Sequence, residues 1–137
     1  DHAAVDLKFA ILEHLKERGI EVVNIGTDTK ERYQYPLAGY RAAKMVASGE
    51  ADGGVLICGT GIGISIAANR HAHVRCALCH DVTTAKLARE HNDANVLAMG
   101  ARTIGDAVAT DMIKAFFATE FAGGRHERRV KKLGGEK

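Results

Sequence analysis

Six consecutive residues, Cys58-Gly59-Thr60-Gly61-Ile62-Gly63, join a thiol directly to a glycine-rich turn. The apolar run before them, residues 54–57, predicts a buried strand, and residues 62–70 have the spacing of a helix. A turn between a strand and a helix leaves backbone N–H groups free at the positive end of the helix dipole, where an anion can bind. That position also favours the thiolate form of a cysteine. The segment therefore predicts a base or nucleophile beside an anion hole.

This turn has two other interpretations. The acid Asp81 lies about twenty residues on, as in a dinucleotide-binding fingerprint, but the glycines follow G-x-G-x-G rather than G-x-G-x-x-G. No lysine followed by serine or threonine is present to make a P-loop. The plainer alternative is that the glycines only permit a tight turn and that Cys58 is an unreactive core residue, as buried cysteines often are.

Two histidine-containing segments are weaker candidates. Cys76-Ala-Leu-Cys79-His80 matches a redox or haem-attachment pattern, but residues 74–79 have strand character, so Cys76 and Cys79 are expected to face opposite sides of the sheet. His91 ends a predicted helix just before a strand, and we expect it near the strand-end face or at an exposed edge. A simple favourable charge at the helix terminus is the alternative for His91.

A basic run follows two glycines near the C-terminus. Arg125 and Arg129 are four residues apart and share one face of a predicted helix, where two guanidinium groups could hold a phosphate. A solvated helix with interspersed glutamate is the competing interpretation. Aromatic residues make up only 5% of the chain and none alternates with this run, so RNA binding has little support.

The surrounding pattern alternates helices and strands. Predicted helices cover residues 7–18, 36–48, 62–70, 82–91 and 106–119, and predicted strands cover 21–25, 54–58, 74–79 and 95–99. Such alternation with short connections implies an α/β fold, with a parallel sheet covered on both faces and ligands bound beyond the carboxyl ends of the strands. Cys58, Asp81 and Gly100 are expected at those ends.

Composition is that of an ordinary globular domain. The 137 residues are 46% hydrophobic and 26% charged with a net charge of +2, and no apolar run approaches the length of a membrane span. Three cysteines do not make a disulfide framework, so a reducing cytoplasm is favoured. The chain opens on Asp1-His2 without methionine, so an upstream piece is expected to be missing.

Taken together, these motifs resemble the type B ribose-5-phosphate isomerases, a family that also contains the galactose-6-phosphate isomerase subunits. The resemblance covers practically the whole chain and rests on Asp1-His2, Tyr35-Pro36, the Cys58–Gly63 turn, the segment 91–97 and the segment 123–129. It implies a three-layer α/β/α sandwich with a Rossmann-like open parallel sheet of about five strands. Family members begin with a short strand that ends in the Asp-His pair, and this strand is expected to be missing here.

The resemblance also implies a reaction and a set of residues. An aldose phosphate and a ketose phosphate are interconverted through a cis-enediolate, with no metal or cofactor. Cys58 is implied as the base, with Thr60 and the N–H groups of residues 59–63 stabilising the enediolate, and His91 is implied in opening the sugar ring. The remaining implied contacts are to the sugar, by Asp1, His2, Tyr35, Gly59, Gly61, Ile62, Gly63 and Asn92, and to the phosphate, by Arg102, Arg125, His126 and Arg129.

In the family two subunits share each site, so the resemblance implies a homodimer. Whether dimers pair into tetramers is left open. Residues 1–137 are then expected to form a single isomerase domain whose segment 121–137 reaches a partner subunit. Two departures bear on substrate size: Gln34 stands where an aspartate is common in the pentose enzymes, and Thr83-Thr84 replaces a frequent Tyr-Ser. A galactose or allose 6-phosphate isomerase and a non-catalytic phosphosugar- or nucleotide-binding module are therefore the alternatives, without a membrane or nucleic-acid partner.

Overall fold

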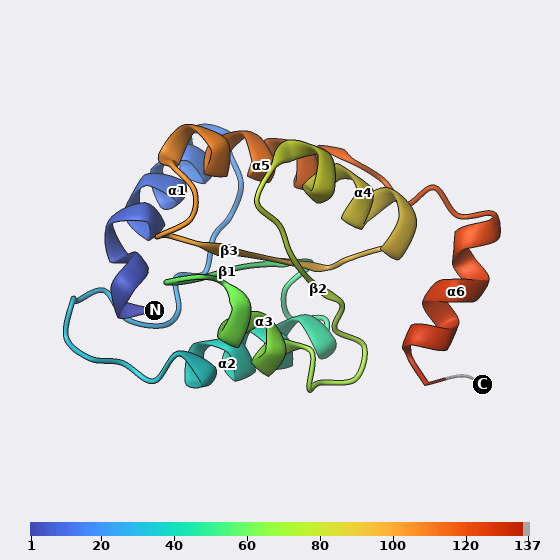
Figure 1. Ribbon diagram of the computed structural model, residues 1–137, viewed down its shortest axis with the longest axis horizontal. Helices are drawn as coiled ribbons and strands as arrows, with labels where there is room; N and C mark the ends of the chain where they lie inside the picture. The colour runs from blue at the N-terminus through green and yellow to red at the C-terminus, as the bar shows by residue number, and fades with distance from the viewer. Residues whose placement is uncertain (136–137) are drawn as a thin grey trace.

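The computed structural model describes residues 1–135 as a parallel sheet between two layers of helices (Figure 1). The strands are β1 (Gly54–Cys58), β2 (Cys76–Leu78) and β3 (Val96–Gly100). The helices are α1 (Val5–Glu17), α2 (Tyr35–Ala47), α3 (Ile62–Ala68), α4 (Val82–Asn92), α5 (Asp106–Ala118) and α6 (Arg125–Leu133), and a short 3-10 helix η1 (His2–Ala4) precedes α1. Within the described part of the chain, no helix has both the length and the apolar character needed to cross a membrane.

The sheet has the order β1-β3-β2 and all of its pairs are parallel. The register pairs Gly54 with Val96 and Cys58 with Gly100, so β1 and β3 end together. All five residues of β3 are buried because it is the central strand with helices over both faces. The end of β1 therefore lies beside the end of the most protected strand, a rigid base for the turn that follows.

Each face of the sheet has its own apolar core. Helices α1, α4 and α5 cover one face, where Leu7, Ile11 and Met112 belong to one buried cluster with Leu97 and Met99 of β3. Helices α2 and α3 cover the other face, with small residues at their contact: a Cβ on Gly39 would lie only 3.1 Å from Ala67 Cβ. The predicted three-layer architecture with an open parallel sheet is confirmed.

Residues 21–25 are not a strand, which corrects the sequence prediction. Val22 packs against the first core cluster and Ile25 against the second, so the alternation that suggested a strand is real. A strand also needs a backbone partner, and within residues 1–135 no backbone group of this segment pairs with a neighbouring strand. The described sheet accordingly has three strands rather than about five.

Other boundaries differ slightly from those predicted. Helix α3 ends at Ala68 rather than Arg70, and β2 keeps only Cys76–Leu78 of the predicted 74–79. Helix α6 has no buried residue and lies outside the three layers, with α4 as its nearest large element (Figure 1). The helix with the most arginines is thus held to the body by few contacts.

Candidate active site

The thiol of Cys58 lies inside the glycine turn that follows β1. Its side chain is only 5% exposed, and the Gly61 N–H donates a hydrogen bond to Sγ over 3.1 Å. The sulfur therefore lies against a backbone donor in the turn that the sequence places after this strand. Helix α3 begins immediately afterwards but has only seven residues, so this direct hydrogen bond matters more than the helix dipole.

Gly61 allows the turn to close over the ends of the neighbouring strands. Its φ is +78°, and an added Cβ would lie 2.6 Å from Leu78 Cδ1 and 2.7 Å from the backbone carbon of Met99. Only glycine adopts this conformation at so close an approach without strain. The same crowding recurs at Gly100, where a Cβ would lie 2.6 Å from Thr60 Cα. Two glycines thus fix Thr60 and the sulfur relative to β3.

Two of the five N–H groups predicted to stabilise an oxyanion are already used. Gly61 donates to Cys58 Sγ, and Ile62 donates to Thr60 Oγ1 over 3.2 Å. Within the part of the chain that the structure describes, the N–H groups of Gly59, Thr60 and Gly63 have no protein acceptor. These three are the donors that the turn can offer to a ligand.

Arg102 brings positive charge to the same turn. The chain after β3 stays alongside it, with Ala101 N–H donating to Cys58 O and Arg102 N–H donating to Gly59 O, both over 2.9 Å. A Cβ on Gly59 would be 3.4 Å from Arg102 Nη1, so the guanidinium covers the turn. An exposed arginine at this point attracts an anion toward Cys58.

Tyr35, Asp1 and His2 also come to this end of the sheet. The Tyr35 ring lies against Gly63, where a Cβ would be 2.5 Å from ring atoms. His2 Nδ1 lies 3.0 Å from Tyr33 N and 3.2 Å from Tyr33 O, so the Tyr33 backbone fixes the position of the ring. Asp1 Oδ1 lies 3.0 Å from the same Nδ1 and is buried without a hydrogen bond. These polar groups surround the mouth of the turn.

The remaining predicted residues form a second group elsewhere. The rings of His91 and His126 stack with centroids 4.4 Å apart, which joins the end of α4 to the start of α6. Asn92 is the last residue of α4, and Arg125 and Arg129 are exposed on α6. Partial desolvation lowers the pKa of His126, and the neighbouring His91, Arg125 and Arg129 lower it further while Glu90 raises it.

The second group lies at the opposite end of the strands from Cys58. Helix α4 runs antiparallel to β3, so its C-terminus with His91 meets the amino end of that strand, whereas Cys58 is level with Gly100 at the carboxyl end. Five strand residues, about 13 Å of chain, separate the two ends. His91 therefore lies, partly exposed, at the amino end of the strands and not at the carboxyl-end face, the first of the two positions predicted for it, and one chain does not bring the two groups together.

The weaker sequence candidates have structural roles. Asp81 Oδ1 accepts from Thr84 N–H over 2.7 Å and caps α4, and this bond lowers the pKa of Asp81. Cys76 and Cys79 pack into different core clusters on opposite faces, as predicted. Burial raises the pKa of Cys76 to about 12, so this thiol stays protonated. Residues 1–135 contain no group of three or more His, Cys, Asp or Glu side chains arranged to hold a metal ion.

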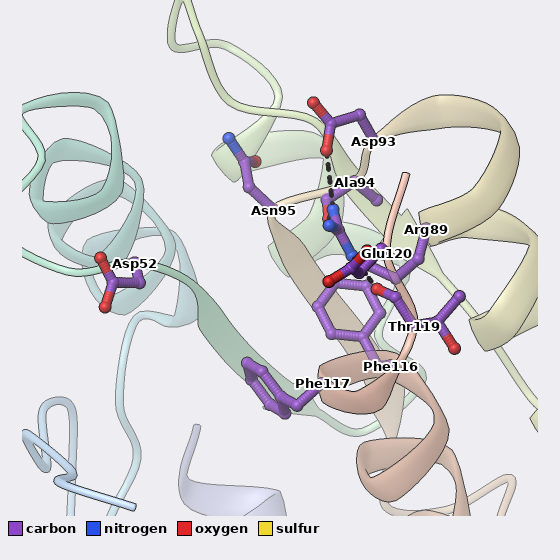
Figure 2. Close-up of a pocket in the computed structure, with 9 residues that line it drawn as sticks. All are labelled: Asp52, Arg89, Asp93, Ala94, Asn95, Phe116, Phe117, Thr119 and Glu120. Carbon is purple, nitrogen blue, oxygen red and sulfur yellow. Dashed lines mark hydrogen bonds and ion pairs between the residues drawn. The ribbon is translucent and has the colours of Figure 1, made fainter. Parts of the chain in front are cut away.

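A cavity of about 320 Å³ lies at the amino-end edge of the sheet (Figure 2). Its polar lining includes the carboxylates of Asp52, Asp93 and Glu120 and a single arginine, Arg89. The Arg89 Nε and Nη1 groups already donate within the protein. A cavity with this excess of negative charge does not suit a phosphate ester, and none of its lining residues belongs to the Cys58 turn.

Comparison with known proteins gives consistent matches over nearly the whole chain. The family described as Ribose/Galactose Isomerase matches residues 1–133. Ribose-5-phosphate isomerase B of Escherichia coli is 47% identical over 133 residues, covering 97% of this chain and 89% of that protein. A galactose-6-phosphate isomerase subunit of Clostridium acetobutylicum is 45% identical over 121 residues, covering 88% of this chain and 70% of that protein. The solved structure of Clostridium thermocellum ribose-5-phosphate isomerase B superposes with a TM-score of 0.97 at 47% identity, covering 98% of this chain and 91% of that one.

Proposed function

The chain belongs to the ribose/galactose isomerase family, and from that premise we propose that this sugar-phosphate isomerase interconverts ribose 5-phosphate and ribulose 5-phosphate. The observation that carries the proposal is the contact of Cys58 Sγ with the Gly61 N–H, at the end of β1 and beside Arg102. It places a thiol, free backbone donors and a cation at one point, and these are the groups that proton transfer next to a carbonyl requires.

In the proposed mechanism Cys58 acts as the base. The thiolate removes the proton from C2 of the open-chain aldose, the C1 carbonyl oxygen takes up the electron pair, and a cis-enediolate forms. The N–H groups of Gly59, Thr60 and Gly63, with the Thr60 hydroxyl, stabilise the negative oxygen. A proton then moves from the C2 hydroxyl to the C1 oxygen, and return of the abstracted proton to C1 leaves the carbonyl at C2 and regenerates the thiolate, so no redox partner is consumed.

The other residues prepare the substrate. His91 assists ring opening by acid–base catalysis, and Asn92 binds near the reacting oxygens. Asp1, His2 and Tyr35 hold the open sugar, together with the turn residues Gly61, Ile62 and Gly63. Arg102, Arg125, His126 and Arg129 bind the phosphate. The three free cysteines fit a reducing compartment, and we assign the protein to the cytoplasm.

We further propose that each active site is formed by two chains, so that the protein acts as a homodimer. Cys58 and His91 lie at opposite edges of one sheet, and α6 has no buried residue of its own. A second copy would bring its α4–α6 end to the Cys58 turn of the first. Residues 1–137 then form one isomerase domain whose segment 121–137 reaches the partner; residues 136 and 137 lie outside the described structure.

Mixing two inactive variants tests this shared site. Cys58→Ala and His91→Ala chains, each inactive alone, are expected to recover about a quarter of wild-type activity after being unfolded and refolded together, because half of the dimers are mixed and each has one intact site. The measurement is turnover as a function of the mixing ratio. No recovery at any ratio, with mixed dimers demonstrated by differential tagging, would contradict a site formed by two chains.

Replacing Arg129 with alanine tests the phosphate assignment. Loss of a charged hydrogen bond is expected to weaken substrate binding by about 1.5 to 3 kcal/mol, roughly tenfold to a hundredfold in KM, with a smaller effect on kcat. Arg128→Ala is the matched control, because it removes the same charge from the adjacent position of α6. An unchanged KM for Arg129→Ala would remove this residue from the phosphate site.

A second candidate function is isomerisation of a hexose 6-phosphate. Gln34, the residue before Tyr35, is exposed and makes no side-chain capping bond at the start of α2, so it is free to face a longer sugar. Ribose 5-phosphate, galactose 6-phosphate and allose 6-phosphate should be assayed side by side, with Cys58→Ala as the control. Turnover of only a hexose ester favours this candidate, and turnover of none favours a non-catalytic binding module.

A further inference from the structure

The end of α4 is held by an arginine that the proposed mechanism does not use. Arg89 lies in the last turn of α4 with its side chain only 20% exposed. Its Nη1 donates to Asp93 Oδ1 over 2.9 Å and to Ala94 O over 2.6 Å, so it fixes the residues that follow His91 and Asn92. Its Cζ lies 5.8 Å from the centroid of the buried Phe116 ring, which positions the guanidinium plane.

Arg89 also binds the chain that leads to α6. Its Nε donates to Thr119 O over 3.1 Å, and Thr119 is the residue that ends α5 (Figure 2). Three residues later, Ala122 N–H donates to Glu90 O over 3.0 Å. One guanidinium thus joins the end of α4 to the start of the connector that carries Arg125, His126 and Arg129.

Asp93, which binds Arg89, has a backbone conformation that is uncommon for a residue other than glycine. It is one of two non-glycine residues with positive φ within residues 1–135, at φ +46° and ψ +44°, and it ends α4. Its carboxylate accepts from Arg89 and, over 3.4 Å, from Arg75 Nη2, while its carbonyl accepts from Arg75 Nε over 2.8 Å. Two arginines hold a strained residue directly after Asn92, which is a pattern found where geometry matters for function.

We propose that Arg89 and Asp93 are positioning residues for the His91 end of the active site, setting the distance between His91 with Asn92 and the phosphate-binding residues of α6. This inference rests on the proposed function of those residues. Helix α6 buries no residue of its own, so the bonds of Arg89, the Ala122–Glu90 bond and the stacked His91–His126 rings determine where it lies. A displacement of about 1 Å at such a site lowers turnover by roughly a hundredfold.

The test compares Arg89→Met, Arg89→Lys and Asp93→Asn with the wild-type enzyme. Methionine keeps an unbranched apolar stem over Phe116 but none of the three hydrogen bonds, and lysine keeps the charge but lacks the fork that reaches Asp93 and Thr119 together. Asparagine tolerates the left-handed conformation and removes only the charge. Lys86→Met is the matched control on α4, because Lys86 makes only an exposed ion pair with Glu90, at 3.8 Å.

For Arg89→Met we expect KM to rise about tenfold and kcat to fall about tenfold, with Arg89→Lys and Asp93→Asn intermediate and Lys86→Met unchanged. Histidine NMR titration supplies a readout that does not depend on turnover. The pKa of His126 is expected to return toward its ordinary value in Arg89→Met, because the His126 ring leaves its packed position beside His91.

A lowered unfolding temperature with unchanged KM, kcat and His126 titration would overturn the proposal, since Arg89 would then be merely structural. If Arg89→Met does not fold, Arg89→Lys and Asp93→Asn carry the same comparison. If the wild-type protein turns over no sugar phosphate, the proposed function fails, and the His126 titration alone decides whether Arg89 positions α6.

Discussion

Replacing Cys58 with alanine is expected to lower kcat for ribose 5-phosphate isomerisation by about 10²- to 10⁴-fold while KM stays within a few-fold. General base catalysis contributes an effect of this size, and the substitution leaves in place the side chains proposed to bind the phosphate. The Cys58 sulfur accepts one backbone N–H, from Gly61 at 3.1 Å, and the Ile62–Thr60 bond and the bonds from Ala101 and Arg102 do not depend on it, so alanine removes the base without removing the turn. Steady-state kinetics at saturating substrate measure the effect.

Cys79→Ala is the matched control for this variant. Cys79 is also a buried cysteine, at 2% exposed, but it lies in the core on the opposite side of the sheet from the Cys58 cluster. It should lose stability and keep its kcat. A Cys58→Ala protein that isomerises at near wild-type rate would exclude Cys58 as the base, and would return this residue to the role of an ordinary core cysteine.

Replacing Gly61 with alanine is expected to destabilise the fold by about 2 to 5 kcal/mol. The left-handed backbone costs an L-residue about 1 to 2 kcal/mol, and the overpacking of Leu78 Cδ1 and the Met99 backbone adds about 1 to 3 kcal/mol. The backbone of β3 is central and cannot shift without disturbing both cores, so relief by local movement is limited. Urea unfolding, followed by circular dichroism, measures the change in free energy.

Substitutions at two other glycines distinguish the backbone strain at Gly61 from the overpacking there. Gly49 has a similar φ of +80° with nothing within 4 Å of an added Cβ, so Gly49→Ala reports the backbone strain alone. Gly105 has a negative φ and open space, so Gly105→Ala should be nearly neutral. If Gly61→Ala cost no more than Gly49→Ala, the close approach of the turn to β3 would not be the source of its rigidity.

Local sequence signals were enough to predict the part of the site that lies close together in the chain. The run of residues 54–63 contains a strand, a glycine turn and a helix start, and β1 and α3 begin at the predicted residues. Gly61 and Cys58 are three residues apart, so their contact depends on turn geometry and not on the rest of the fold. The opposite faces of Cys76 and Cys79 were predictable for the same reason.

Features that depend on distant partners were not predictable in this way. Residues 21–25 have strand alternation, but a strand forms only with a hydrogen-bonded neighbour, which local patterning cannot reveal. The local pattern left two positions open for His91, and the antiparallel direction of a crossover helix, which places its C-terminus at the amino end of the next strand, decides between them. Arg89 gave no signal beyond an Arg-Asp pair four residues apart, because the partner that links it to the connector of α6, Thr119, is thirty residues away.

The placement of Cys58 and His91 at opposite edges of one sheet has an evolutionary consequence. If two chains form each site, the two copies of a duplicated gene can specialise. One copy can lose Cys58 and its turn, the other can lose the His91 and α6 residues, and the pair still assembles one complete site. Each copy is then free to change its remaining half toward a different sugar. A split arrangement of this kind turns a homodimeric enzyme into an obligate pair of distinct subunits without any new chemistry.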